Sequence, residues 1–192
     1  YNTDLVKPDK APKAWFDLCK PDFKGQVSFD PPETRFMAGL YVMMGEAKTK
    51  EWFKCMGQNQ PIIQQGHTQR MELMLTGDHA VQGDNYFYTG VEAKKKDPKA
   101  PFAMVLSAPV LSFAGAMVIN KNTQHPYASA LFVDWTLGED SQNLINSILR
   151  GPLTIKHPYL PEDVKLVTYI IVGDDVTKPL HEAWNQSIGR MK

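Results

Sequence analysis

The sequence predicts an α/β protein, in which short apolar strands alternate with helices along the chain. The strand-like stretches 27–30, 62–63 and 79–82 are each followed by a segment with helical spacing of apolar residues. Prolines and glycines, 14 and 13 in number, separate these stretches rather than clustering. Apolar residues make up 43% of the 192, enough for a substantial core. This alternation favours a parallel or mixed sheet covered by helices.

The first half of the chain contains most of the predicted strand–helix units. Residues 1–26 are interrupted by Pro8, Pro12, Pro21 and Gly25, which leaves room for one or two helical turns over 14–19. The periodicity then predicts a strand at 27–30, helices at 33–44, 46–56, 68–75 and 86–96, and strands at 62–63 and 79–82. Gly45 and Gly57 end the first two helices.

The second half has a different character. Strands are predicted at 102–106, 114–119 and 167–172, and helices at 126–137, at 140–149 and around Trp184. A boundary between the two parts is expected near Ser107-Ala108-Pro109.

The charge balance excludes several classes of protein. Lysines and arginines equal aspartates and glutamates at 21 each. A nucleic-acid-binding protein usually carries a basic excess, because phosphate contacts supply most of its affinity. The run Lys94-Lys95-Lys96 is therefore interpreted as a solvated helix end. No apolar run approaches the ~20 residues that span a bilayer.

Familiar catalytic signatures are absent from the sequence. It contains no nucleophile elbow, phosphate loop, dinucleotide fingerprint or His-Glu-x-x-His motif. The five histidines show no metal-ligand spacing. Cys19 and Cys55 allow either one disulfide in an oxidising compartment or two free thiols.

Two loops that lead from a strand into a helix are candidates for ligand binding. Glu33, Thr34 and Arg35 follow the first strand, and Gly66, His67 and Thr68 follow the second. Free backbone N–H groups at a helix start attract anions, and open α/β sheets bind ligands at the carboxyl ends of their strands. The alternative is two capped helices with a solvated arginine.

A third loop, Asp84-Asn85-Tyr86-Phe87-Tyr88, follows the third strand and carries the candidates Asn85, Tyr86 and Tyr88. Phenols two positions apart point about 200° apart on a helix, so they can hold one ligand only from an irregular turn or a helix start. Tyrosines in such a place can ligate a hard cation, stack or donate hydrogen bonds. The alternative is ordinary aromatic packing.

A series of short motifs, each weak alone, resembles one known family in order and spacing. The series runs Tyr1-Asn2-Thr3, Pro12-Lys13-x-Trp15-x-Asp17-Leu18, Lys24-Gly25, Gly66-His67-Thr68, Gly77-Asp78, Asn122-x-x-His125-Pro126-x-Ala128-x-x-Leu131-Phe132-Val133-Asp134 and Gly138-Glu139-Asp140-x-Gln142. It resembles the extracellular solute-binding proteins of ABC importers, in the branch that contains the periplasmic ferric-ion-binding proteins.

The resemblance implies a type II periplasmic-binding-protein fold, in which two α/β lobes close on a ligand by hinge bending. Residues 1–108 resemble the second, ligand-binding lobe with its hinge strands. Residues 109–192 resemble the C-terminal portion of the first lobe. The N-terminal part of that lobe, about 100 residues on the usual domain scale, is then expected to be missing. Its absence would leave apolar surface exposed on 110–192, for a half-lobe or a second copy to cover.

The resemblance also implies roles for the three loops. The helix start at Glu33-Thr34-Arg35 holds an anion or the ligand's acidic group, with Gly66-His67-Thr68 beside it. In the iron binders the segment like 85–88 carries adjacent tyrosine ligands. Here Phe87 separates Tyr86 from Tyr88, leaving Tyr88 as one ligand for Fe(III). A single phenolate is poor provision for that ion, so an organic or phosphorylated anion is favoured.

These features predict a non-catalytic periplasmic protein that captures a small ligand and delivers it to an inner-membrane ABC permease, with no cofactor other than Fe(III) as cargo. One alternative is a small α/β enzyme using Tyr88, Arg35 and His67 as acid–base groups. Another is a ligand-sensing domain of a regulator or receptor.

Overall fold

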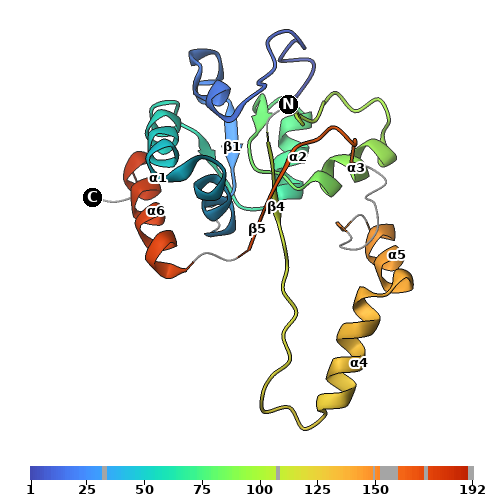
Figure 1. The fold of residues 1–192 in the computed structure, drawn as a ribbon. Helices are drawn as coiled ribbons and strands as arrows, with labels where there is room; N and C mark the ends of the chain where they lie inside the picture. The colour runs from blue at the N-terminus through green and yellow to red at the C-terminus, as the bar shows by residue number, and fades with distance from the viewer. Residues whose placement is uncertain (32–33, 107–108, 149, 152–159, 171–172, 190–192) are drawn as a thin grey trace. The chain divides into compact units, whose positions relative to one another are not determined.

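The structure is a computed structural model that describes residues 1–31, 34–106, 109–148, 150–151, 160–170 and 173–189 (Figure 1). These residues form two compact units. One comprises residues 1–114 and 164–192, and the other comprises 115–163. The boundary between lobes that the sequence predicts at 108/109 is not tested by this division into units, and it stays a prediction. Within the described residues, no helix is both long and apolar enough to cross a membrane.

The first unit contains a three-stranded parallel sheet in the order β2-β1-β3. Its strands are β1 (Val27–Phe29), β2 (Ile62–Ile63) and β3 (Val81–Gln82). Ser28 pairs with Ile62 on one side and with Gln82 on the other, so β1 is central. All three residues of β1 are buried. Apolar Val27 and Phe29 flank Ser28, as expected for a parallel strand that is covered on both faces.

Helices connect these strands as the periodicity predicts. The connections are α1 (Thr34–Gln58), α2 (His67–Leu75) and α3 (Phe87–Lys96), preceded by the short 3₁₀ turns Trp15–Cys19 and Pro21–Phe23. The two helices predicted at 33–44 and 46–56 are one element with a break at Gly45, whose φ of 79° lies in the left-handed region. Each predicted strand–helix unit from residue 27 to residue 96 is therefore present.

A second, two-stranded parallel sheet pairs β4 (Val110–Phe113) with β5 (Leu166–Tyr169). Helix α1 packs closely on it, because a Cβ on Gly39 would lie 2.8 Å from the Tyr169 ring and 2.9 Å from Leu111. The Tyr169 hydroxyl also donates a hydrogen bond to the Arg35 carbonyl at 2.7 Å. The predicted strands at 102–106 and 114–119 are wrong: Phe102 makes only an isolated bridge to Asn2, and pairing moves to 110–113.

Helix α6 (Asp174–Ser187) lies beside α1 and completes an aromatic core. Trp184 stacks on Trp52 with ring centroids 6.0 Å apart, and Phe53 and Phe29 contact the same pair edge-on. All four side chains are essentially inaccessible to solvent. The N-terminal and C-terminal parts of this unit therefore share one core.

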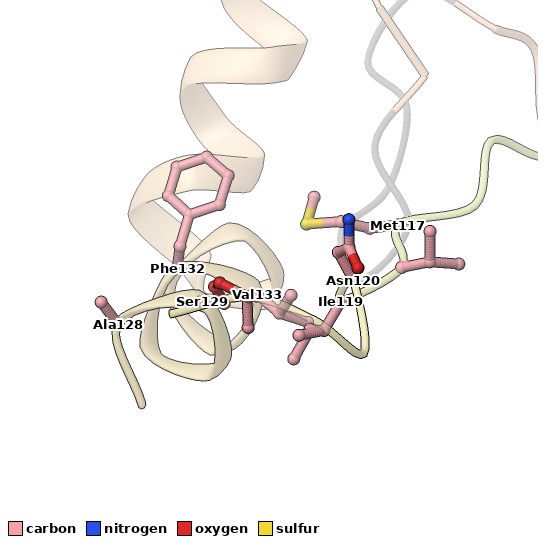
Figure 2. A pocket seen from close by; sticks show the side chains of 9 residues that line it. Met117, Ile119, Asn120, Ala128, Ser129, Phe132 and Val133 are labelled. Carbon is pink, nitrogen blue, oxygen red and sulfur yellow. The ribbon is translucent and has the colours of Figure 1, made fainter. Parts of the chain in front are cut away.

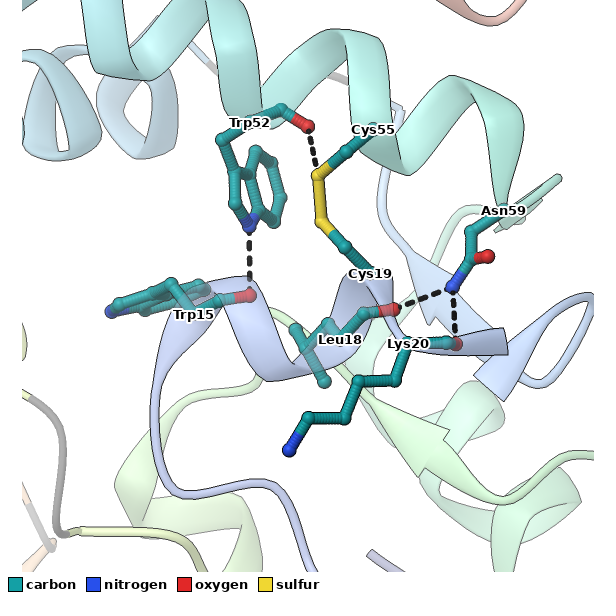
Figure 3. The surroundings of a disulfide bond; sticks show 7 residues. All are labelled: Trp15, Leu18, Cys19, Lys20, Trp52, Cys55 and Asn59. Atoms are coloured by element: carbon teal, nitrogen blue, oxygen red, sulfur yellow. Dashed lines mark hydrogen bonds between the residues drawn. A yellow bond between two sulfur atoms is a disulfide. The ribbon is translucent and has the colours of Figure 1, made fainter. Parts of the chain in front are cut away.

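A disulfide between Cys19 and Cys55 ties the first 3₁₀ turn to α1 (Figure 3). Beside it, the Trp52 indole donates to the Trp15 carbonyl at 2.8 Å. The Asn59 side-chain amide donates to the carbonyls of Leu18 and Lys20 at 2.7 and 2.9 Å. The structure therefore selects the disulfide from the two alternatives that the sequence allows.

The second unit contains α4 (Pro126–Leu137) and α5 (Glu139–Ser147), preceded by residues 115–120 in extended conformation outside any strand. No residue of α4 is buried. In α5 the buried residues are the polar Ser141 and Gln142. Among its described residues, this unit therefore buries no large apolar side chain of its own.

Candidate functional site

The carboxyl ends of β1, β2 and β3 bring three loops together. Asp30 follows β1, Gly66 and His67 follow β2, and Asp84 follows β3. Because all three strands are parallel, these residues lie at the same edge of the sheet. The position is the one at which open α/β sheets bind ligands.

A fully buried guanidinium lies at the centre of this edge. Arg70 of α2 donates through Nη1 to Asp84 Oδ1 at 2.8 Å and to the Ser28 carbonyl at 3.2 Å. Its Nη2 donates to Asp30 Oδ2 at 3.3 Å and to the Asp84 carbonyl at 3.4 Å. One side chain therefore contacts the segments that follow two different strands.

The two carboxylates also bind the loops directly. Both oxygens of Asp84 accept the backbone N–H of Asp30, at 3.1 and 3.2 Å. Asp30 Oδ2 in turn accepts the N–H of Gly66 at 3.2 Å and lies 3.1 Å from His67 Nδ1. We name Asp30, Arg70 and Asp84 the charge cluster.

Burial raises the pKa of Asp84 to about 6, because the charged carboxylate is removed from water. Arg70 and the Asp30 N–H oppose this effect by stabilising the charged form, whereas the nearby Asp30 carboxylate adds to it. The net result is a carboxyl group that changes protonation close to neutral pH.

Aromatic rings lie beside the charge cluster. The His67 and Tyr86 rings stack with centroids 4.3 Å apart, and the Tyr86 and Tyr88 rings stack at 5.4 Å. Tyr86 is the extended residue that precedes α3, and Tyr88 is in its first turn. The two tyrosines therefore lie at a helix start, one of the two places from which phenols two positions apart can hold one ligand. We name His67, Tyr86 and Tyr88 the ring cluster.

Asn85 links two of the loops. Its side-chain amide donates to Gln82 Oε1 at 2.7 Å, and its Oδ1 accepts the Tyr86 N–H at 2.8 Å. Gln82 then donates to the His67 carbonyl at 2.8 Å. The loops that carry His67 and Tyr86 are thus held together by amides as well as by charge.

A buried Ser–His–Asp series joins Ser28 of β1 to the two residues, Asp78 and His79, that lie before the amino end of β3. Ser28 Oγ is 2.8 Å from His79 Nε2, and His79 Nδ1 is 3.6 Å from Asp78 Oδ2, beyond hydrogen-bond distance. Burial lowers the pKa of His79. Ser28 and His79 are both 0% exposed, so no substrate can reach this hydroxyl in the observed arrangement. Ser28 and His79 are therefore part of the buried core.

A family model described as bacterial extracellular solute-binding protein matches residues 1–175. The chain belongs to this family.

The relatives of this solute-binding chain include iron-binding proteins. A Fe(3+)-binding periplasmic protein of Serratia marcescens is 24% identical over 170 residues, a match covering 77% of this chain and 46% of that protein. Iron-bound HitA from Pseudomonas aeruginosa aligns with a TM-score of 0.67 at 16% identity, covering 98% of this chain and 63% of HitA. The periplasmic binding protein P5PA aligns with a TM-score of 0.54 at 20% identity, covering 96% of this chain and 63% of P5PA. Both structures establish the fold alone.

The chain spans about half the length of the curated relative and less than two thirds of either solved relative. The predicted architecture is confirmed: the chain is α/β and covers part of the periplasmic-binding-protein fold.

Of the predicted site residues in this solute-binding chain, those after β2 and β3 come together. Gly66 and His67 bond to the charge cluster, and Asn85, Tyr86 and Tyr88 lie at the adjoining loop. Thr68 is the second residue of α2 rather than its N-cap, because Gly66 occupies that position. These assignments to ligand binding stay predictions.

The predicted residues after β1 lie apart from both clusters. Thr34 Oγ1 is 3.0 Å from His181 Nε2 of α6, and the Arg35 guanidinium lies 5.0 Å from the Phe113 ring centroid. Within the described part of the chain, neither residue has a hydrogen bond or ring contact with either cluster. Glu33 lies outside the described residues.

The sequence did not identify Asp30 and Arg70 as site residues, and it included Asp84 in the third loop without assigning it a role. Asp30 and Asp84 follow strands, which is a usable signal at a sheet edge. Arg70 carries no such signal, since an arginine between Gln69 and Met71 is typical of a solvated helix face.

Proposed function

We propose that this chain forms the ligand-binding lobe of a periplasmic solute-binding protein, which captures a small ligand and delivers it to an ABC permease. The observation that carries the proposal is the convergence of three loops at one sheet edge, where polar and aromatic side chains gather. Ligand binding between lobes would favour the closed state.

A periplasmic location is supported by the disulfide. Cys19 and Cys55 are paired, and disulfides persist in oxidising compartments such as the bacterial periplasm. The Serratia marcescens relative is itself called periplasmic.

The geometry favours ferric ion over an organic or phosphorylated anion as the ligand. Arg35, the residue expected to hold an anion, has its guanidinium over the Phe113 ring, and Arg70 is engaged by two carboxylates. Tyr86 and Tyr88, separated by Phe87 in sequence, have their rings stacked in space. Phenolate oxygen suits hard cations, so Tyr88 with Tyr86 beside it is better provision for Fe(III) than Tyr88 alone.

The ligand class is tested by colour. Loading the purified protein with ferric citrate is expected to give a visible tyrosinate-to-iron absorption band. Tyr88→Phe is expected to remove most of that band, whereas Tyr127→Phe, a change at a tyrosine that is 90% exposed in α4, leaves it intact. A colourless wild-type protein rejects iron.

If the iron-loaded protein is colourless, the anion alternative is tested by melting temperature. Inorganic phosphate and citrate are added in excess, and a true ligand raises the melting temperature according to RT ln(1 + [L]/Kd). No shift with iron or with either anion would overturn the binding function itself.

We propose further that the second unit is completed by an α/β segment of the same protein. Residues 117–119 are extended and apolar, with Val118 85% exposed, and they belong to no strand. Leu131, 69% exposed, and Phe132 lie on α4 nearby. A helix and a neighbouring segment that are apolar on several sides are typical of a buried core.

A pocket of about 460 Å³ lies between the extended segment and α4 (Figure 2). Met117, Ile119, Phe132 and Val133 are among the side chains that line it. More than a third of the HitA chain has no counterpart in this one, which gives a covering segment of adequate size. The occupant would add a strand beside 117–119 and cover α4.

Hydrogen exchange tests this completion. The amides of 117–119 are expected to exchange quickly in the 192-residue chain and slowly in the full polypeptide that its gene encodes. Val118→Asp is expected to lower dye binding and self-association of the 192-residue chain, whereas Val42→Asp on exposed α1 surface does not. A gene that encodes no further α/β segment would overturn the proposal, as would a full polypeptide in which the amides of 117–119 exchange as fast as in the 192-residue chain.

A further inference from the structure

The contribution of the charge cluster to stability does not explain why its charges are buried. Arg70 is fully buried, and its Nε has no hydrogen-bond partner in the described structure. Burying two carboxylates and a guanidinium costs desolvation energy that their mutual attraction rarely exceeds, and apolar residues of similar volume often stabilise such a place better. Helix α2 already buries Met71 and Met74 next to this position. Stability alone therefore does not explain an arginine here.

The contacts of Arg70 indicate another role. Its two terminal nitrogens reach the segments after β1 and β3, and α2 itself begins at the loop after β2. The planar guanidinium fixes the angle between two carboxylates, which a flexible ammonium does not. All three loops of the candidate site are thus connected to one rigid group, the Arg70 guanidinium.

The same contacts extend to the aromatic rings. Asp30 holds His67 at 3.1 Å, and Asp84 begins the loop that places Tyr86 at the start of α3. The His67–Tyr86 separation of 4.3 Å depends on the relative position of these two loops.

We infer that Arg70 and Asp84 are positioning residues, which hold the three loops so that His67, Tyr86 and Tyr88 form one stacked cluster for the ligand. The inference rests on the proposed function for its ligand. The arrangement of the rings is nevertheless a property of the protein alone. It is therefore measurable when no ligand is known.

The first test measures the ring cluster without ligand. Stacked rings shift one another's NMR signals, so the ring resonances of Tyr86 in labelled protein report the stack directly. Arg70→Met is expected to move these resonances toward unstacked values, and Arg70→Lys, which keeps the charge but not the fork, to restore part of the shift. Signals from Trp52 and Trp184 in the aromatic core are expected to stay in place.

Asp84→Asn provides a milder variant if Arg70→Met fails to fold. The amide keeps one acceptor oxygen for Arg70 but places an N–H donor group against the Asp30 N–H. Its Tyr86 resonances are expected to move, whereas those of Glu92→Gln, an exposed acid on the same α3, are not. Unchanged Tyr86 resonances in a folded Asp84→Asn protein overturn the inference.

The second test measures binding of ferric citrate to the full protein. Arg70→Met and Asp84→Asn are expected to weaken it at least tenfold, with partial rescue in Arg70→Lys. Tenfold weakening with an undisturbed ring cluster overturns positioning by this route. If wild type binds no iron, the proposed ligand fails, and the ring measurement still decides the role of Arg70.

Discussion

The two units of this chain differ in how their apolar residues are used. In the first unit, aromatic side chains from β1, α1 and α6 are buried against one another, and charged groups at the sheet edge are paired. In the second, a helix as apolar as α4 has no buried residue. Apolar side chains are therefore buried against one another in the first unit, whereas those of α4 in the second unit stay exposed to solvent.

Paired tryptophan substitutions test this difference with the largest expected effect. Trp184 is 2% exposed and Trp135 is 49% exposed. Trp184→Ala is expected to cost about 3–5 kcal/mol of unfolding free energy, because it leaves a large cavity. Trp135→Ala is expected to cost within about 0.5 kcal/mol in the 192-residue chain. Denaturant titration measures both, and equal losses would show that α4 is already packed.

The disulfide contributes to the first unit only. Cys19 and Cys55 are 36 residues apart, and closing a loop of that length in the unfolded state is worth about 3–4 kcal/mol. The double variant Cys19→Ser, Cys55→Ser is expected to lose stability by this order, as is the wild type under reductant. Exchange protection in α4 is the internal control. If it fell in parallel with that of α1, the two units would be unfolding together.

The stability of the first unit is expected to depend on pH through Asp84. Its pKa is about 6 in the folded protein and ordinary when unfolded, so between about pH 6 and pH 4 the folded state holds a proton that the unfolded state lacks. Stability therefore gains from Asp84 as pH falls from 7 through 6, by at most about 3 kcal/mol. This gain is complete near pH 4.

Asp84→Asn removes this contribution, so its stability curve is expected to be flatter than that of wild type over this range. Glu92→Gln is the matched control, since the Glu92 side chain is exposed on α3, the helix that Tyr86 precedes. Thermal unfolding at several pH values measures the stability curves of the wild type and both variants. Parallel curves for wild type and Asp84→Asn would assign the proton to another group.

The strand–helix order from residue 27 to residue 96 follows from sequence, because Gly45 and the other glycines interrupt clear periodicities. The strand at 114–119 was predicted wrongly. The apolar run extends from 110 to 119, and only the partner β5 determines that 110–113 pairs. Register with a distant strand is not encoded in local pattern.

The site shows the same limit. His67 and Tyr86 were predicted from their places after strands, and the structure brings them together. Arg70 was missed because the helical pattern around it does not reveal that its position faces the sheet edge. A buried charge is recognised by its partners, and Asp30 and Asp84 lie 40 and 14 residues away in sequence.

The return of α6 to α1 has a consequence for biogenesis. Trp52 and Phe53 meet Trp184 only after more than 130 further residues have been synthesised. Contacts so far apart in sequence form slowly, since a long loop must close first. Until α6 has been synthesised, the nascent chain thus lacks the helix that covers Trp52 and Phe53.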